Sequence, residues 1–297
     1  MWPLQQLARD LLAPPPGMPA VDFSAPAGAP ALFAPDSVSW AVMKSPVALL
    51  VGGIAAMILE LAEPRVRTGV WEHTSFRTDP AGRIHRTGYA AMATIYAPEA
   101  PARALIESVN RRHERIAGVT PAGIAYRADD PELLTWVHAT AAFGFLEAYR
   151  RFVRPLLPGD CDRFYAEGAR AAVLYGVVDS PRSAQAMDAL FAAMRPALER
   201  SQIVLDALAI LYREPWLPIW ARPLQGLSVR AAVEITPGWA REILGLGRLY
   251  DLPFGAEAIV RALGAAGERI VLDAPPAQAC TRLGLRKDYL YRRTLAR

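Results

Sequence analysis

The chain has 297 residues, 53% of them hydrophobic, which is enough to bury a large core in one or two domains. Its net charge is only +4, and its cations, nearly all arginine, are spread out without a long basic run. This pattern argues against a nucleic-acid-binding protein. Two cysteines, Cys161 and Cys280, are too few and too far apart for a disulfide framework or a paired-cysteine zinc site. We therefore expect a cytoplasmic protein without nucleic-acid partners.

The N-terminal segment differs in composition from the rest of the chain. Residues 1–35 are rich in Pro, Ala and Gly and lack the basic and apolar regions of a signal peptide. We expect residues 1–40 to form an extended, partly disordered arm, followed by one domain over residues 41–297. The most apolar run, residues 45–59, is short and flanked by Lys44 and Glu60. It therefore predicts a buried core helix and no transmembrane segment.

The rest of the chain has the composition of helices separated by Pro and Gly. Ala, Leu, Arg and Glu dominate, and alternating β-branched residues are scarce. Two short helices are expected at the end of the chain, and the other predicted helices cover residues 46–62, 81–96, 101–117, 131–154, 160–174, 183–212, 220–234, 239–244 and 256–263. The sequence thus predicts an all-α fold, a single large domain of about ten or more helices.

One predicted helix is apolar around its whole circumference. Residues 133–146 are interrupted by only three polar side chains, those of Thr135, His138 and Thr140. A helix of this kind belongs at the centre of a domain. We therefore expect His138 to be buried and structural.

The common catalytic motifs are missing. None of the four histidines has Glu three residues before it, so the signature of a di-iron helical bundle is absent. The sequence also lacks His-Glu-x-x-His, Cys-x-x-Cys-His, Gly-x-Ser-x-Gly and a glycine-rich phosphate loop. These absences argue against most familiar enzyme classes as the function of this chain.

His113 interrupts an apolar stripe. The apolar positions recur every three or four residues at Ala102, Leu105, Ile106, Val109 and Ile116. A buried neutral imidazole must bond within the core or bind something placed there, such as the iron of a noncovalent haem. Periodicity alone favours a hydrogen-bonded core histidine and leaves the ligand role open.

Two neighbouring groups of polar residues are candidate site residues. Arg83, Arg86 and Thr87 share one face at the start of a predicted helix, either at a pocket mouth or on a solvated surface. His73 lies just before the turn at Asp79, which reads as an N-cap. Its imidazole either covers a pocket or bonds to a loop carbonyl.

The order of these segments resembles the MpaB / rubber-oxygenase catalytic-domain family over about residues 45–285. The resemblance rests on Gly52-Gly53, Leu61-Ala62-Glu63-Pro64, Glu72-His73-Thr74-Ser75-Phe76, Arg83-x-x-Arg86-Thr87, His113-Glu114, and Asp130-Pro131-Glu132-Leu133-Leu134-x-Trp136-Val137-His138-Ala139. It extends more weakly through Asp179-Ser180-Pro181 and residues 217–223. The family implies an all-α domain with one b-type haem, and oxidative cleavage of isoprenoid carbon–carbon double bonds with O₂.

The resemblance also implies roles for single residues. His113 would be the iron ligand, and Arg83 and Thr87 would form the catalytic pair on the opposite, oxygen-binding side. Arg86 and His73 would line the cofactor site. Arg86 stands where one branch of the family has a Lys able to reach the iron, and an arginine stays protonated and cannot replace it. Glu63 stands where many relatives have His.

Three functions follow as hypotheses. The first is a haem b (iron) dependent oxygenase acting with O₂ on an apolar, isoprenoid or alkene-containing small molecule. The second is a non-catalytic protein of the same fold that binds haem or an apolar ligand. The third is a metal hydrolase that uses Glu72, His73 and His85, on the basis of loose spacing alone.

Overall fold

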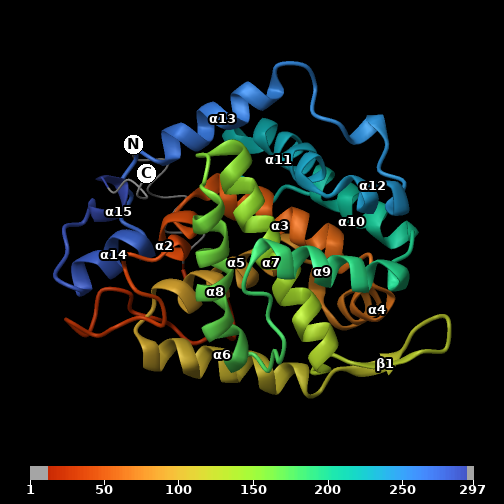
Figure 1. The fold of residues 1–297 in the computed structure, drawn as a ribbon, viewed down its shortest axis with the longest axis horizontal. Coiled ribbons are helices and arrows are strands. Elements are labelled where there is room, and N and C mark those ends of the chain that lie inside the picture. The colour runs from red at the N-terminus through yellow and green to blue at the C-terminus, as the bar shows by residue number, and fades with distance from the viewer. Residues whose placement is uncertain (1–12, 293–297) are drawn as a thin grey trace.

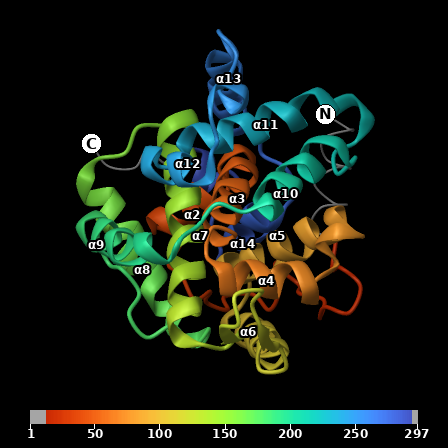
Figure 2. The same ribbon diagram turned by 90° about the vertical axis from the view of Figure 1, so that its right-hand side faces the viewer.

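The computed structural model describes residues 13–292 (Figures 1 and 2). Over these residues the chain forms fourteen α-helices and one short hairpin, which confirms the predicted all-α domain. The first seven helices are α2 (Val38–Met43), α3 (Pro46–Glu60), α4 (Pro64–His73), α5 (Pro80–Tyr96), α6 (Glu99–His113), α7 (Pro131–Phe152) and α8 (Pro158–Leu174). The others are α9 (Ala184–Met194), α10 (Gln202–Arg213), α11 (Arg222–Ile235), α12 (Gly238–Leu244), α13 (Ala256–Gly267), α14 (Pro275–Arg282) and α15 (Tyr289–Arg292).

Helices α3 and α7 form the centre of the molecule, where Figure 2 shows them side by side. Glycines allow their backbones to touch, because a Cβ atom added to Gly144 would lie 2.3 Å from the carbonyl oxygen of Gly52. Most of α3 is buried, and the α7 side chains of Trp136, Leu146 and Phe152 are also in the core. Both helices were expected to be core helices, and this prediction is confirmed.

Helix α8 packs on α7, and α6 packs on both α5 and α8. Polar contacts join α5 and α6 to the end of α8. The hydroxyl groups of Thr94 on α5 and Tyr175 after α8 are hydrogen-bonded at 2.8 Å. Asn110 on α6 donates from Nδ2 to the carbonyl oxygen of Leu174, also at 2.8 Å. These contacts position the two helices that carry Arg83, Thr87 and His113.

Three local predictions differ from the structure. A separate helix, α4, follows α3 after a bend of 112°, because Glu63 and Pro64 start a new helix. The predicted helix 101–117 ends at His113, and an antiparallel hairpin follows, β1 (Ala117–Val119) with β2 (Ala125–Arg127). The predicted helix 183–212 is broken at η2 (Arg195–Ala197), where Pro196 removes a backbone donor, and restarts at α10 after the Ser201 cap.

The described part of the N-terminal arm is packed onto the domain. Residues 13–37 form no helix, yet Phe23 and Phe33 are buried beside Trp40. The buried Arg282 of α14 donates to the carbonyl oxygens of Phe23 and Ala29 at 2.6 and 2.9 Å. Residues 1–12 and 293–297 lie outside the described residues, so the prediction of disorder in the first segment stays a prediction.

Over residues 13–292 no individual helix has enough apolar length to cross a bilayer. Within that range only the bent pair α3 and α4, taken together, is long and apolar enough to cross a bilayer, and this holds for length and composition alone.

Candidate functional site

Arg83 and Thr87 lie one turn apart on α5, which starts at the Asp79 cap. The carboxylate of Asp79 accepts a hydrogen bond from the Gly82 amide at 2.8 Å, and Pro80 occupies the first turn. Arg83 donates from Nη1 to the Thr87 hydroxyl at 2.9 Å, and that hydroxyl donates to the Arg83 carbonyl oxygen at 3.0 Å. The hydroxyl thereby holds the guanidinium group in one orientation. Burial lowers the pKa of Arg83, and nearby Glu60 opposes this shift.

Glu60 is a site residue that the sequence reasoning missed. It is the last residue of α3, and burial raises the pKa of its carboxyl group to about 7, opposed by the charge of Arg83. The Glu60 carboxyl group has no hydrogen bond or ion pair with any residue of the described range 13–292. The available signal was its position, a single carboxylate at the end of the most apolar helix of the chain.

His113 is the last residue of α6 and is influenced by the charge of Arg83. Its Nδ1 atom is buried and has no hydrogen-bond partner among the described residues. Burial lowers the pKa of the imidazole, the charge of Arg83 lowers it further, and Asp129 opposes the shift. The ring is therefore neutral at neutral pH and has an uncommitted nitrogen lone pair.

His138 adds a second neutral imidazole on α7. Burial lowers its pKa to about 4. Its ring faces α8 at a position without a side chain, since a Cβ atom added to Gly168 would lie 3.8 Å from His138 Cε1. A glycine at this point leaves room for the imidazole between the two helices.

The side chains of Arg86 and His73 bond to residues outside the group of Arg83, Glu60 and His113. Arg86 donates to the hydroxyl of Ser75 and forms an ion pair with Asp79 at 3.6 Å, while its charge still lowers the pKa of Arg83. His73 is exposed at the end of α4, and its Nε2 atom is hydrogen-bonded to the Tyr126 hydroxyl of the hairpin at 3.2 Å. The structure therefore groups Arg83, Thr87, Glu60 and His113, with Arg86 beside them, and attaches His73 to the hairpin.

Glu63 has a structural role at the start of α4. Its buried carboxylate accepts a hydrogen bond from the Val66 amide at 2.8 Å and one from Arg65 Nε at 2.6 Å. It is the N-cap of the helix, where a negative charge is favourable. In this chain Glu63 therefore acts as the cap of α4.

The hypothesis of a metal hydrolase gains no support. Within residues 13–292, no three His, Cys, Asp or Glu side chains are grouped to hold a metal ion, and Glu72, His73 and His85 are included in that range. His85 instead bonds from Nε2 to the carbonyl oxygen of Ala13 at 2.9 Å. This contact attaches the N-terminal arm to α5.

No curated protein and no solved structure is significantly similar to the chain. A family model described as "ER-bound oxygenase mpaB/B'/Rubber oxygenase, catalytic domain" matches residues 40–269, which include every residue of the group around Arg83. Because the match covers most of the sequence, the chain belongs to this family of oxygenases.

Proposed function

We propose that the chain is a b-type-haem-dependent oxygenase that acts with O₂ on an apolar substrate containing an isoprenoid or other alkene. The observation that carries the proposal is the His113 ring, which is neutral, buried at Nδ1 and free of hydrogen bonds to the described residues. Leaving such a ring unpartnered costs free energy, which an iron–nitrogen bond would offset.

The residues around His113 suit a haem. A porphyrin supplies four nitrogen ligands of its own, so a single protein ligand is sufficient. Half-buried apolar side chains on α3 and α7, including Met57, Val137 and Phe145, pack against the core and offer surface for the macrocycle. The partial accessibility of His113 and Arg83, combined with pKa shifts caused by burial, is typical of side chains that border a desolvated space. Arg83, with Arg86 beside it, would provide positive charge for the haem propionates.

Each residue then has a defined task. The bound haem would supply O₂ binding and activation. Arg83, oriented by Thr87 and partly removed from solvent, presents N–H donors that would interact with developing negative charge. Glu60 can take up or release a proton at its carboxyl oxygen near neutral pH. The apolar side chains exclude water and receive the substrate.

Absorption spectroscopy of purified protein tests this function. The wild type, expressed with excess haem, should contain haem and show a Soret band at about 400 nm. His113→Ala should lose most of the bound haem, whereas His85→Ala, which removes only the bond to Ala13, should keep it. A wild type without a Soret band would contradict the cofactor proposal. Full haem occupancy in His113→Ala would contradict the ligand assignment alone.

A second candidate is a haem or apolar-ligand binding protein of the same fold without turnover. It is favoured by Arg86, which replaces a lysine found in one branch of the family and is engaged with Ser75 and Asp79. Oxygen uptake coupled to consumption of an isoprenoid alkene separates the two candidates. Stoichiometric uptake supports the oxygenase, and haem binding without uptake supports the second candidate.

A further inference from the structure

Apolar side chains gather on the surface where α10 ends and where two short 3₁₀ turns follow, η3 (Ile219–Ala221) and η4 (Arg248–Tyr250). Ile219 and Leu249 are 76% and 84% exposed, and Trp220 and Tyr212 are about half exposed. Large aliphatic and aromatic side chains are usually covered, so a cluster of them on turns indicates a binding surface.

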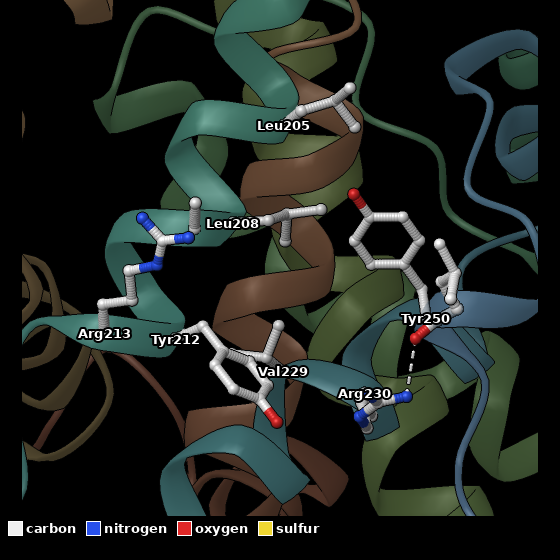
Figure 3. A pocket seen from close by; sticks show the side chains of 9 residues that line it. Leu205, Leu208, Tyr212, Arg213, Val229, Arg230 and Tyr250 are labelled. Atoms are coloured by element: carbon white, nitrogen blue, oxygen red, sulfur yellow. Dashed lines mark hydrogen bonds between the residues drawn. The ribbon is translucent and has the colours of Figure 1, made fainter.

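The end of α10 and η4 border one pocket, and η3 follows α10 after a short segment and packs, like η4, on α11. The pocket has a volume of about 180 Å³, and its lining includes Leu208, Tyr212, Arg213, Leu249 and Tyr250. Figure 3 shows Tyr212 and Arg213 on one side of this pocket and Arg230 and Tyr250 on the other. The region lies on the α10 and α11 side of the molecule, away from α5 and α6 (Figure 1).

Backbone contacts hold the turns in place. Arg230 of α11 donates from Nη1 to the carbonyl oxygens of Leu249 and Asp251 at 2.7 and 2.8 Å, which fixes η4. Gln225 donates from Nε2 to the carbonyl oxygens of Leu211 and Glu214 at 2.9 and 2.7 Å, which fixes the segment that leads to η3. The exposed side chains are thus presented by an ordered framework.

The surface carries unpaired positive charge. Arg213, Arg222 and Arg248 are exposed, and their guanidinium groups have no hydrogen bond or ion pair with any residue of the described range 13–292. One exposed carboxylate, Glu214, lies among them, while Asp251 is already paired with Arg241. Three arginines against one free carboxylate favour a negatively charged partner.

We infer that the exposed side chains of residues 212–222 and 248–249, here called the docking face, bind the surface of a lipid bilayer that carries anionic lipid. Trp and Tyr prefer the headgroup level, aliphatic side chains insert below it, and Arg pairs with phosphate. A second copy of the chain fits less well, because a symmetric contact would bring the three arginines toward their own copies. This inference is independent of the haem proposal and requires no membrane-spanning helix.

Vesicle co-sedimentation of the full-length chain tests the docking face. We expect binding to vesicles of phosphatidylcholine mixed with phosphatidylserine, weaker binding to phosphatidylcholine alone, and weaker binding at high salt. Arg213→Gln combined with Arg248→Gln should lower partitioning onto anionic vesicles about thirty-fold. Trp220→Ser combined with Leu249→Ser should lower it about tenfold or more on both vesicle types.

Matched controls change the same residue types on another surface. Val173→Ser with Val178→Ser replaces two exposed apolar residues, and Arg170→Gln with Arg182→Gln removes two exposed charges, on α8 and the loop after it. Both controls should bind like the wild type, and circular dichroism should show all variants folded. Failure of the wild type to bind anionic vesicles, or equal loss in controls and test variants, overturns the inference. A solution dimer broken by both test variants also overturns it, since the face would then belong to a second copy.

Discussion

At the scale of single residues, Glu60, Arg83 and His113 carry ionisable groups whose pKa values are shifted mainly by burial. Burial disfavours the charged form of each group, which raises the pKa of the acid and lowers those of the two bases. Arg83 remains a cation because its ordinary pKa is far above neutrality, whereas His113 becomes neutral. The group therefore combines one fixed positive charge, one free imidazole and one carboxyl group poised to titrate.

The titration of Glu60 predicts a pH dependence of stability. Its folded pKa, about 7, exceeds its ordinary value of 4.5, so the folded state holds the proton more tightly than the unfolded state does. The contribution to the free energy of unfolding is fully present below the ordinary value and is lost as the pH rises to about 7. The loss is at most about 3 kcal/mol. Glu60→Gln cannot ionise, so this variant should not show this loss of stability as the pH rises.

Urea unfolding at a series of pH values measures this effect. As the pH rises from 4.5 to about 7, the free energy of unfolding of the wild type should fall relative to that of Glu60→Gln. Glu242→Gln, at an exposed carboxylate of α12, provides the control and should follow the wild type. Parallel curves for the wild type and Glu60→Gln would show that the carboxyl group titrates as it does in water.

At the scale of elements, the crossing of α3 and α7 depends on two glycines. A Cβ atom on Gly52 would lie 2.6 Å from the Gly144 carbonyl oxygen, and one on Gly144 would lie 2.3 Å from that of Gly52. Both distances are far below van der Waals contact, and both obstacles are backbone atoms that cannot rotate away. These glycines allow the close approach of the two helices at the centre of the domain.

Substitution at this crossing should be strongly destabilising. Gly144→Ala forces the two backbones apart and should lower the free energy of unfolding by about 2–4 kcal/mol, measured by denaturant unfolding. Gly53→Ala is the matched control on α3, because its Cβ atom would lie 3.8 Å from Phe145 Cε1, an ordinary contact. Since alanine favours a helix, Gly53→Ala should be neutral or stabilising by up to about 1 kcal/mol. Equal effects at both sites would refute the close-crossing argument.

At the scale of the whole molecule, the two ends of the described chain are joined. The carbonyl oxygens of Phe23 and Ala29 in the arm accept hydrogen bonds from Arg282 of α14, and the Gly28 amide donates to the Arg282 carbonyl oxygen at 2.7 Å. Farther along the arm, Tyr89 of α5 donates to the Pro19 carbonyl oxygen at 3.0 Å. The arm thus covers α5 and connects it to the C-terminal helices.

Removal of the Arg282 guanidinium group should release the arm. Arg282→Met keeps most of the buried volume but leaves two carbonyl oxygens without donors, at an expected cost of about 2–4 kcal/mol. Residues 13–37 should then become more sensitive to limited proteolysis, with a lower melting temperature. Arg286→Met removes an exposed arginine paired with Asp288 in the same region and should change neither property. An equally protected arm in Arg282→Met would mean that the buried aromatics suffice to hold it.

Several features were predictable from local patterns in the sequence. The all-α class and the two core helices follow from apolar periodicity, which acts over a few turns of one segment. The pairing of Arg83 with Thr87 follows from helical spacing, and the position of His113 follows from its apolar stripe. The segment order from Gly52 to His138 also predicted the family that the comparison shows.

The tertiary structure decided what depends on contacts between distant segments. Glu60 and Arg83 influence each other although they belong to different helices, so no local pattern could place that carboxylate in the site. Glu63 looked like a departure within the family motif, and only its bond to the Val66 amide shows that it caps α4. Composition and periodicity determine which segments are helical and which faces are apolar. How those helices pack determines which side chains are buried, and therefore the shifted pKa values of Glu60, Arg83 and His113, because desolvation depends on all neighbours in space. Packing also determines which apolar side chains stay exposed.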